Sequence, residues 1–194
     1  TGLRHIHLEL PPEVPLGRLD KLVLRLALDQ GCRGVLLVSG PVPASALAQV
    51  LAALQEAPSE VLLGLPAPLP AASRLWRLLG RWTVADWLAP LRYYSTHFLK
   101  AIPFELNQEH LRGRAQLLCQ AEYLGAPVQR LALADLGLPA APMMAHWQLI
   151  RVLMELRRHR FGVFCSLRYR NLAPIRYQDK TGMLYNSHQR ALQT

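Results

Sequence analysis

The chain has few cysteines, few lysines and no long uninterrupted apolar run. Its three cysteines, Cys32, Cys119 and Cys165, are widely spaced and form no CxxC pair, which argues against a disulfide framework and against a zinc ribbon. Because such cysteine usage is typical of proteins that stay reduced, we expect a cytoplasmic location. Charged residues and prolines interrupt every apolar stretch before it reaches the length of a bilayer crossing, so the sequence predicts no transmembrane segment.

The common catalytic signatures are also missing. The sequence contains no Ser–His–Asp or Walker-type pattern, and its glycines do not form a phosphate loop. His5 and His7 could share a metal ion from one face of an early strand, but no matching later ligands are visible, which favours a partly exposed edge strand. Glu105, predicted at the end of a strand, is a candidate general base; the alternative is that it caps the helix that Asn107 begins.

Positive charge is concentrated in the second half and is almost entirely arginine. Residues 1–90 hold 8 Lys and Arg against 7 Asp and Glu, whereas residues 91–194 hold 14 against 6. Arginine suits bidentate contacts with phosphate, and the tyrosines among these residues can stack on planar rings. We therefore predict a surface for nucleic acid or another polyanion; a genome rich in arginine codons is the alternative explanation. The candidate binding residues are Arg112, Arg114, Arg168, Tyr169, Arg170 and Arg176.

Strand-like and helix-like segments alternate along the chain, which predicts an α/β fold with a mostly parallel sheet. A complete eight-unit barrel takes about 250 residues, so we expect an open sheet or an abridged (βα) barrel over residues 1–160. Residues 161–194 are predicted to form a basic C-terminal strand or hairpin segment packed on the same domain. Helices are predicted for 16–30 and from Pro43, Asn107 and Pro142, and strands for 34–39, 61–65, 101–106 and 128–134.

Two of these expectations bear directly on topology. Strands 34–39 and 61–65 should be adjacent and parallel, because a helix-length segment with one apolar face joins them. Residues 117–136 fit a helix–turn–strand, with a DNA-binding helix–turn–helix as the alternative. In an open parallel sheet the functional site should lie at the carboxyl ends of the strands.

Three segments of the second half together resemble the collagenase-like peptidase family. They are residues 100–111 (KAIPFELNQEHL), 131–139 (LALADLGLP) and 164–186 (FCSLRYRNLAPIRYQDKTGMLYN). The resemblance covers about half of the chain, from Lys100 to Ala191. It implies an abridged barrel with an iron–sulfur centre that supports oxygen-independent hydroxylation of RNA bases or of the ubiquinone ring.

The resemblance also implies which residues would hold the cluster. The family's cluster uses four cysteines; here Cys165 falls where one is expected, and His146 stands near the place of another. A cluster-bearing enzyme and a non-catalytic relative or partner subunit therefore both stay open. The leading hypothesis is a divergent hydroxylation protein acting on or beside RNA or a quinone precursor. The alternatives are a non-catalytic nucleic-acid-binding protein that uses the Arg/Tyr-rich C-terminal segment and a scaffold subunit for an acidic protein partner.

Overall fold

The computed structural model describes residues 16–57, 59–67, 82–109, 111–134, 136, 147, 150–152, 154 and 155. Several predictions fall outside these residues. They concern the His5 and His7 pair, the basic segment 161–194 and the predicted site residues His146, Cys165, Arg168, Tyr169, Arg170 and Arg176.

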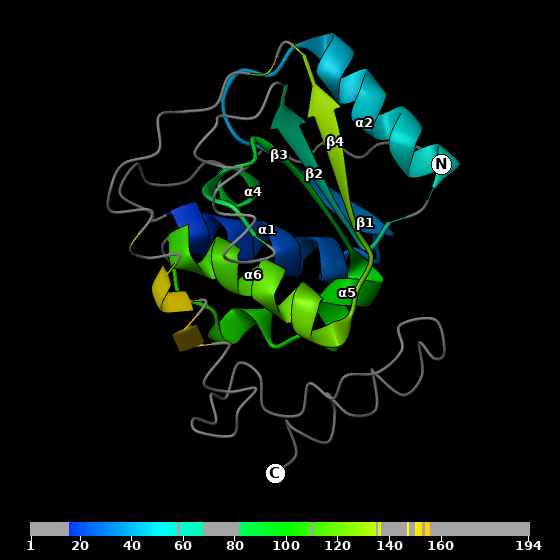
Figure 1. Ribbon diagram of the computed structural model, residues 1–194. Coiled ribbons are helices and arrows are strands. Elements are labelled where there is room, and N and C mark those ends of the chain that lie inside the picture. Colours follow the sequence, from blue (N-terminus) through cyan, green and yellow to red (C-terminus); the bar gives the residue numbers. More distant parts are fainter. Residues whose placement is uncertain are drawn as a thin grey trace.

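Four strands form one open, mixed sheet in the order β1-β3-β2-β4 (Figure 1). The strands are β1 (Gly34–Val38), β2 (Val61–Pro66), β3 (Leu91–Ser95) and β4 (Val128–Leu133). Strand β3 is antiparallel to both β1 and β2, and β2 is parallel to β4. Three of the four strands therefore run in one direction. The α/β class and the open sheet are confirmed.

The predicted pairing of the first two strands is only half right. Strands β1 and β2 do run in the same direction, but β3 lies between them and separates them. Strand β2 is buried along its whole length, as its apolar run predicts, whereas β1 is mostly half-buried and ends at the exposed Val38. Below, the carboxyl edge means the edge of the sheet at which β1, β2 and β4 end.

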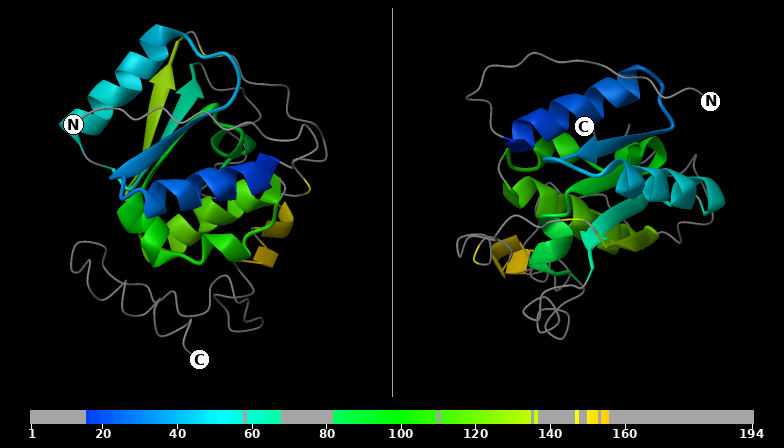
Figure 2. Two further views of the ribbon diagram at one scale, coloured as in Figure 1. Left: turned by 180° about the vertical axis from the view of Figure 1, so that it is seen from behind. Right: turned by 90° about the horizontal axis from the view of Figure 1, so that it is seen from above.

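The helices form layers on both faces of the sheet (Figures 1 and 2). Helices α1 (Leu16–Asp29), α4 (Val84–Trp87), α5 (Thr96–Ala101) and α6 (Leu111–Leu124) share one hydrophobic core with one face of β2. Helix α2 (Ala44–Glu56) packs on the opposite face through a second core that includes Val50, Leu62 and Leu91. Neighbouring residues of β2 therefore point to opposite layers, as a two-residue side-chain repeat requires.

Glycines end two of the helices in the way the sequence predicts. Gly31 follows α1 with φ of 64° and Gly125 follows α6 with φ of 70°, in the left-handed region that glycine adopts without strain. Residues after Gly125 turn directly into β4, so the helix–turn–strand prediction is confirmed and the helix–turn–helix alternative is wrong. None of the helices in the described part of the chain has the length and apolar character that a membrane crossing needs.

The strand predicted for residues 101–106 is wrong. The end of α5 and the 3-10 helix η1 (Phe104–Leu106) occupy these positions. Ser95 begins α5 because its hydroxyl accepts a hydrogen bond from the backbone N–H of Phe98 at 2.9 Å. The predicted helix start at Asn107 is also displaced, since α6 begins at Leu111.

Candidate functional site

A buried cluster of three charged side chains joins α1, β3 and α6. Nε of Arg114 donates to Oδ2 of Asp20 at 2.7 Å, and Nη1 of Arg92 donates to the same oxygen at 3.2 Å. Nη2 of Arg92 also donates to Oγ of Ser39, the residue that follows β1, at 3.0 Å. The exposed fractions of these side chains are 1% for Arg92, 7% for Arg114 and 11% for Asp20. We call Asp20, Arg92 and Arg114 the arginine cluster.

Local structure explains why these charges are buried. Asp20 shares the inner stripe of α1 with Leu24 and Ala27, at helical spacing. Arg92 pairs with Leu37 of β1 and Leu63 of β2, so it lies in the interior of the sheet, near its carboxyl edge. Because the bond to Ser39 also fixes the guanidinium at the end of β1, the cluster lies where open α/β sheets bind their ligands.

The arginine cluster carries more positive charge than negative charge, since two guanidinium groups share one carboxylate. Burial lowers the pKa of Arg114, and the charge of Arg92 lowers it further, while Asp20 acts in the opposite direction. Burial likewise raises the pKa of Tyr94, which lies beside the cluster in β3. Among the described residues, Nε of Arg92 is buried without a hydrogen-bond partner. One N–H donor of the cluster is therefore unsatisfied by the described residues.

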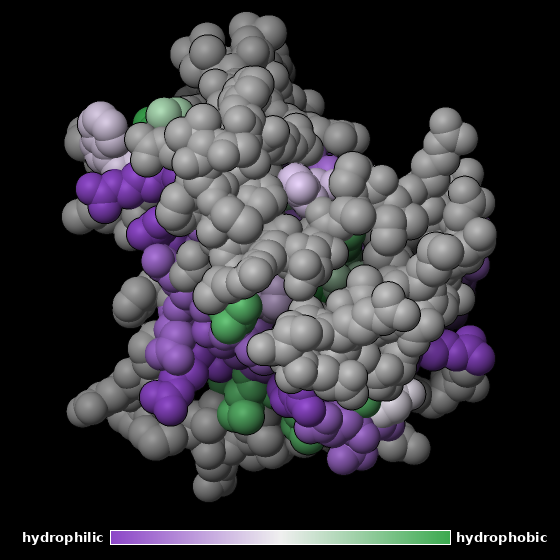
Figure 3. All heavy atoms as spheres, turned by 90° about the horizontal axis from the view of Figure 1, so that it is seen from below, coloured by the Kyte–Doolittle hydropathy of each residue, from purple (hydrophilic) through white to green (hydrophobic). Residues whose placement is uncertain are grey.

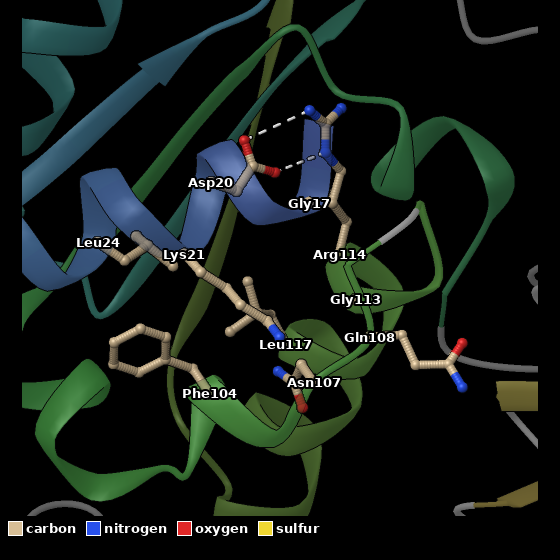
Figure 4. A pocket seen from close by; sticks show the side chains of 10 residues that line it. All are labelled: Gly17, Asp20, Lys21, Leu24, Phe104, Asn107, Gln108, Gly113, Arg114 and Leu117. Carbon is tan, nitrogen blue, oxygen red and sulfur yellow. Dashed lines mark hydrogen bonds and ion pairs between the residues drawn. The ribbon is translucent and has the colours of Figure 1, made fainter. Parts of the chain in front are cut away.

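A small cleft adjoins the arginine cluster between α1 and the start of α6 (Figure 4). The space between its atoms is about 240 Å³, which includes open solvent, and its enclosed part has room for about one water molecule. In the close-up, Asp20 and Arg114 face each other at one end, and Lys21 extends along the cleft toward Asn107. The lining residues are Gly17, Asp20, Lys21, Leu24, Phe104, Asn107, Gln108, Gly113, Arg114 and Leu117.

Another arginine, Arg130 of β4, lies level with Arg92 across the strands of the sheet. Leu63 of β2 pairs with Arg92 on one side and with Arg130 on the other. Nε of Arg130 donates to Oδ1 of Asp86 at 2.6 Å, and its guanidinium lies 4.9 Å from the ring centroid of Trp82. The other oxygen of Asp86 accepts from the backbone N–H of Thr83 at 2.6 Å, which fixes the start of α4.

A third polar group lies at the opposite edge of the sheet. Glu60 accepts from the hydroxyl of Ser95 and contacts Nδ1 of His97 at 2.8 Å. A nucleophile triad needs the histidine between the hydroxyl and the carboxylate, whereas here the carboxylate lies in the middle. The arrangement therefore fixes the start of α5 and does not prepare Ser95 for attack.

The described residues among the predicted site residues lie in three separate places. Glu105 is on the surface in η1, where its carboxylate pairs with Arg25 at 3.3 Å and both side chains are about half exposed. Hydrophilic residues form much of the described surface on the face seen from below (Figure 3). Arg112 is half-buried in the first turn of α6, and Arg114 belongs to the arginine cluster. The general-base role of Glu105 and the anion-binding role of Arg112 stay predictions.

Among the described residues, no three His, Cys, Asp or Glu side chains converge to hold a metal ion. Cys119 is buried within α6 and Cys32 is half-buried after α1. Sequence reasoning missed Asp20 and Arg92. The available signals were an acidic residue in the apolar stripe of α1 and a basic residue among the strand-forming residues 91–94.

The comparisons with known proteins show a likeness of fold. No protein-family model and no curated protein sequence matches the chain. Two crystal structures of glucosyl-3-phosphoglycerate synthase from Mycobacterium tuberculosis are similar, each with a TM-score of 0.50 and 16% sequence identity over 80% of this chain. One is a complex with Mn²⁺, UDP and glucosyl-3-phosphoglycerate, and the other with Mn²⁺, UDP and phosphoglyceric acid. The chain spans 59% and 58% of their lengths.

This likeness is one of fold, and it corrects the functional prediction. The leading hypothesis of oxygen-independent hydroxylation, with its iron–sulfur, RNA and ubiquinone chemistry, is wrong, because the similar structures are of glucosyl-3-phosphoglycerate synthase. The nucleic-acid-binding and scaffold alternatives are set aside on the same ground. The resemblance of residues 100–191 to the collagenase-like peptidase family is untested by these neighbours and stays a prediction.

Proposed function

We propose that this chain forms the nucleotide-binding part of an enzyme that transfers a sugar from a nucleoside diphosphate. The observation that carries the proposal is the likeness of the fold to a synthase bound to UDP. A cation-rich cluster at the carboxyl edge of the sheet supports it, because that edge is where open α/β sheets bind nucleotides. A nucleoside diphosphate thus replaces the nucleic acid of the sequence prediction as the anionic partner. The cytoplasmic location expected from cysteine usage belongs to the same proposal.

The chemistry of sugar transfer needs positive charge near the phosphates. When the bond between the sugar and the diphosphate breaks, the leaving nucleoside diphosphate gains negative charge. A preorganised guanidinium group in a dry site stabilises such charge without further rearrangement. Arg114 fits this role because it is buried, fixed by Asp20 and lines the cleft.

The proposal is tested by calorimetric titration of the full chain with UDP and with UDP-glucose, followed by an assay for UDP release from UDP-glucose. We expect saturable binding of both nucleotides. AMP, which has another base and one phosphate group fewer than UDP, is the control. Equal binding of AMP would show that the site recognises phosphate and not the nucleotide. If neither UDP nor UDP-glucose binds at millimolar concentration, the proposal is wrong.

A further inference from the structure

The loop between β1 and α2, residues 39–43, is held to the sheet by its first residue, and we call it the β1 loop. The backbone N–H of Ser39 donates to the carbonyl oxygen of Pro90 at 2.8 Å. The hydroxyl of Ser39 accepts from Nη2 of Arg92 at 3.0 Å. Pro90 directly precedes β3 and Arg92 is the second residue of that strand. Two hydrogen bonds to β3 therefore fix the place where the β1 loop begins.

Beyond Ser39, the sequence of the β1 loop restricts its backbone. Gly40 has φ of 85°, in the left-handed region that residues with a side chain adopt only with strain. The rings of Pro41 and Pro43 then restrict φ at two of the next three positions. The carbonyl oxygen of Pro43 accepts from the backbone N–H groups of Ala46 and Leu47, which joins the loop to α2. Because the loop is stiff, the position of Ser39 affects the position of the whole loop.

The β1 loop lies at the carboxyl edge, where the connections from two parallel strands part. After β1 the chain continues into α2 on one face of the sheet, whereas the next described helix after β2 is α4, on the other face. In open α/β sheets, ligands bind outside the carboxyl ends of the strands at such a switch point. Gly40 and Pro41 are exposed there. The β1 loop is therefore placed to contact a nucleotide bound at this edge.

Arg92 is suited to hold the β1 loop because its own side chain is fixed. The side chain is 1% exposed, and Nη1 donates to Oδ2 of Asp20 in α1 at 3.2 Å. A hydrogen bond from a charged donor is stronger than one between neutral groups. The bond from Arg92 to Ser39 therefore ties the β1 loop to α1, although the loop leads to α2 on the opposite face.

We propose, on the basis of the proposed function, that Arg92 is a positioning residue that orders the β1 loop for nucleotide binding. Arg92 stays in the interior and acts on the ligand only through the hydroxyl of Ser39. If the loop loses this bond, fewer molecules hold it in the binding-competent position, and the apparent dissociation constant rises in proportion. A bond that served stability alone would leave the affinity of the folded protein unchanged.

The test compares UDP binding, by calorimetric titration, to the wild-type full chain and to Ser39→Ala, which leaves Arg92 paired with Asp20. We expect Ser39→Ala to weaken UDP binding by about threefold to tenfold, which corresponds to one hydrogen bond. Ser39→Thr keeps the hydroxyl and should restore most of the affinity. Ser59→Ala is the matched control, because it removes a half-buried hydroxyl that bonds Gln129 at 2.7 Å, at the opposite edge of the sheet. It should leave the affinity unchanged.

Hydrogen exchange measures the order of the β1 loop without any nucleotide. The backbone amides of Ser39, Gly40 and Val42 report on the loop, because proline has no N–H. Exchange at Gly40 and Val42 should be faster in Ser39→Ala than in the wild-type chain. Unchanged exchange there would overturn the positioning role.

The binding outcomes separate this inference from the proposed function. If UDP binds the wild-type chain and Ser39→Ala equally, the positioning role is wrong, while nucleotide binding itself stands. If Ser59→Ala weakens binding as much as Ser39→Ala does, lower stability and not the β1 loop explains the loss, and the inference fails. If UDP does not bind the wild-type chain, the proposed function fails and this inference fails with it.

Discussion

Removal of the single acidic member of the arginine cluster should destabilise the fold far more than removal of one basic member. Asp20→Asn keeps the shape of the side chain but leaves Arg92 and Arg114 buried with no negative partner. Breaking a buried ion pair by removing one partner costs about 3–5 kcal/mol, and here two guanidinium groups lose their partner. We expect Asp20→Asn to lower the free energy of unfolding by about 5 kcal/mol or more.

Arg114→Gln should have a smaller effect, because it leaves Arg92 and Asp20 as a balanced pair and removes the repulsion between the two arginines. The loss is then mainly that of hydrogen bonds to a charged group, about 1.5–3 kcal/mol. Urea unfolding followed by far-UV circular dichroism measures both values, and equal slopes would show that the same surface is exposed on unfolding. If Arg114→Gln lowered the free energy of unfolding by as much as Asp20→Asn or more, the argument from an excess of positive charge in the cluster would be refuted.

Three further predictions concern single positions. Gly113→Ala should destabilise the protein, because the new Cβ would lie 2.1 Å from the backbone oxygen of Gln108. This clash should outweigh the higher helix propensity of alanine, which is about 1 kcal/mol. An increase in melting temperature would contradict this contact. Ser95→Ala should cost about 1 kcal/mol in urea unfolding by removing the cap on Phe98, and Ser95→Gly should cost less. Because its pKa is raised, Tyr94 stays protonated in the folded state above pH 10, where the same residue ionises in the unfolded chain. The free energy of unfolding should therefore fall as pH rises beyond 10. Tyr94→Phe should make this dependence of stability on pH less steep.

Much of the first part of the fold could be predicted from the sequence because its signals are local. The apolar spacing in α1, the continuous apolar run in β2 and the glycines after α1 and α6 each specify a structure through neighbours a few residues away. The helix–turn–strand of α6 and β4 was recognised for the same reason. In each of these segments the local preference and the tertiary environment agree.

Strand β3 could not be predicted in the same way. Its five residues, LRYYS, contain Arg92 in the middle of the sheet and end with Ser95, which also begins a helix. A charged residue in such a short segment indicates a surface position, whereas Arg92 is 1% exposed. Because β3 was missed, β1 and β2 were predicted to be neighbours, and the next apolar stretch, at 101–106, was assigned as a strand in its place.

The arginine cluster was hidden from the sequence for a related reason. Asp20 is separated by 72 residues from Arg92 and by 94 residues from Arg114, so no local spacing connects them. Stability alone does not explain the cluster, because buried ion groups are often no better than apolar residues of similar volume, and an unbalanced group is worse. Among the described residues, two buried arginines share one aspartate, which leaves a deficit of negative charge in this part of the core. Under the proposed function, the phosphate groups of UDP would supply the missing negative charge, so the titration with UDP also tests this explanation of the cluster.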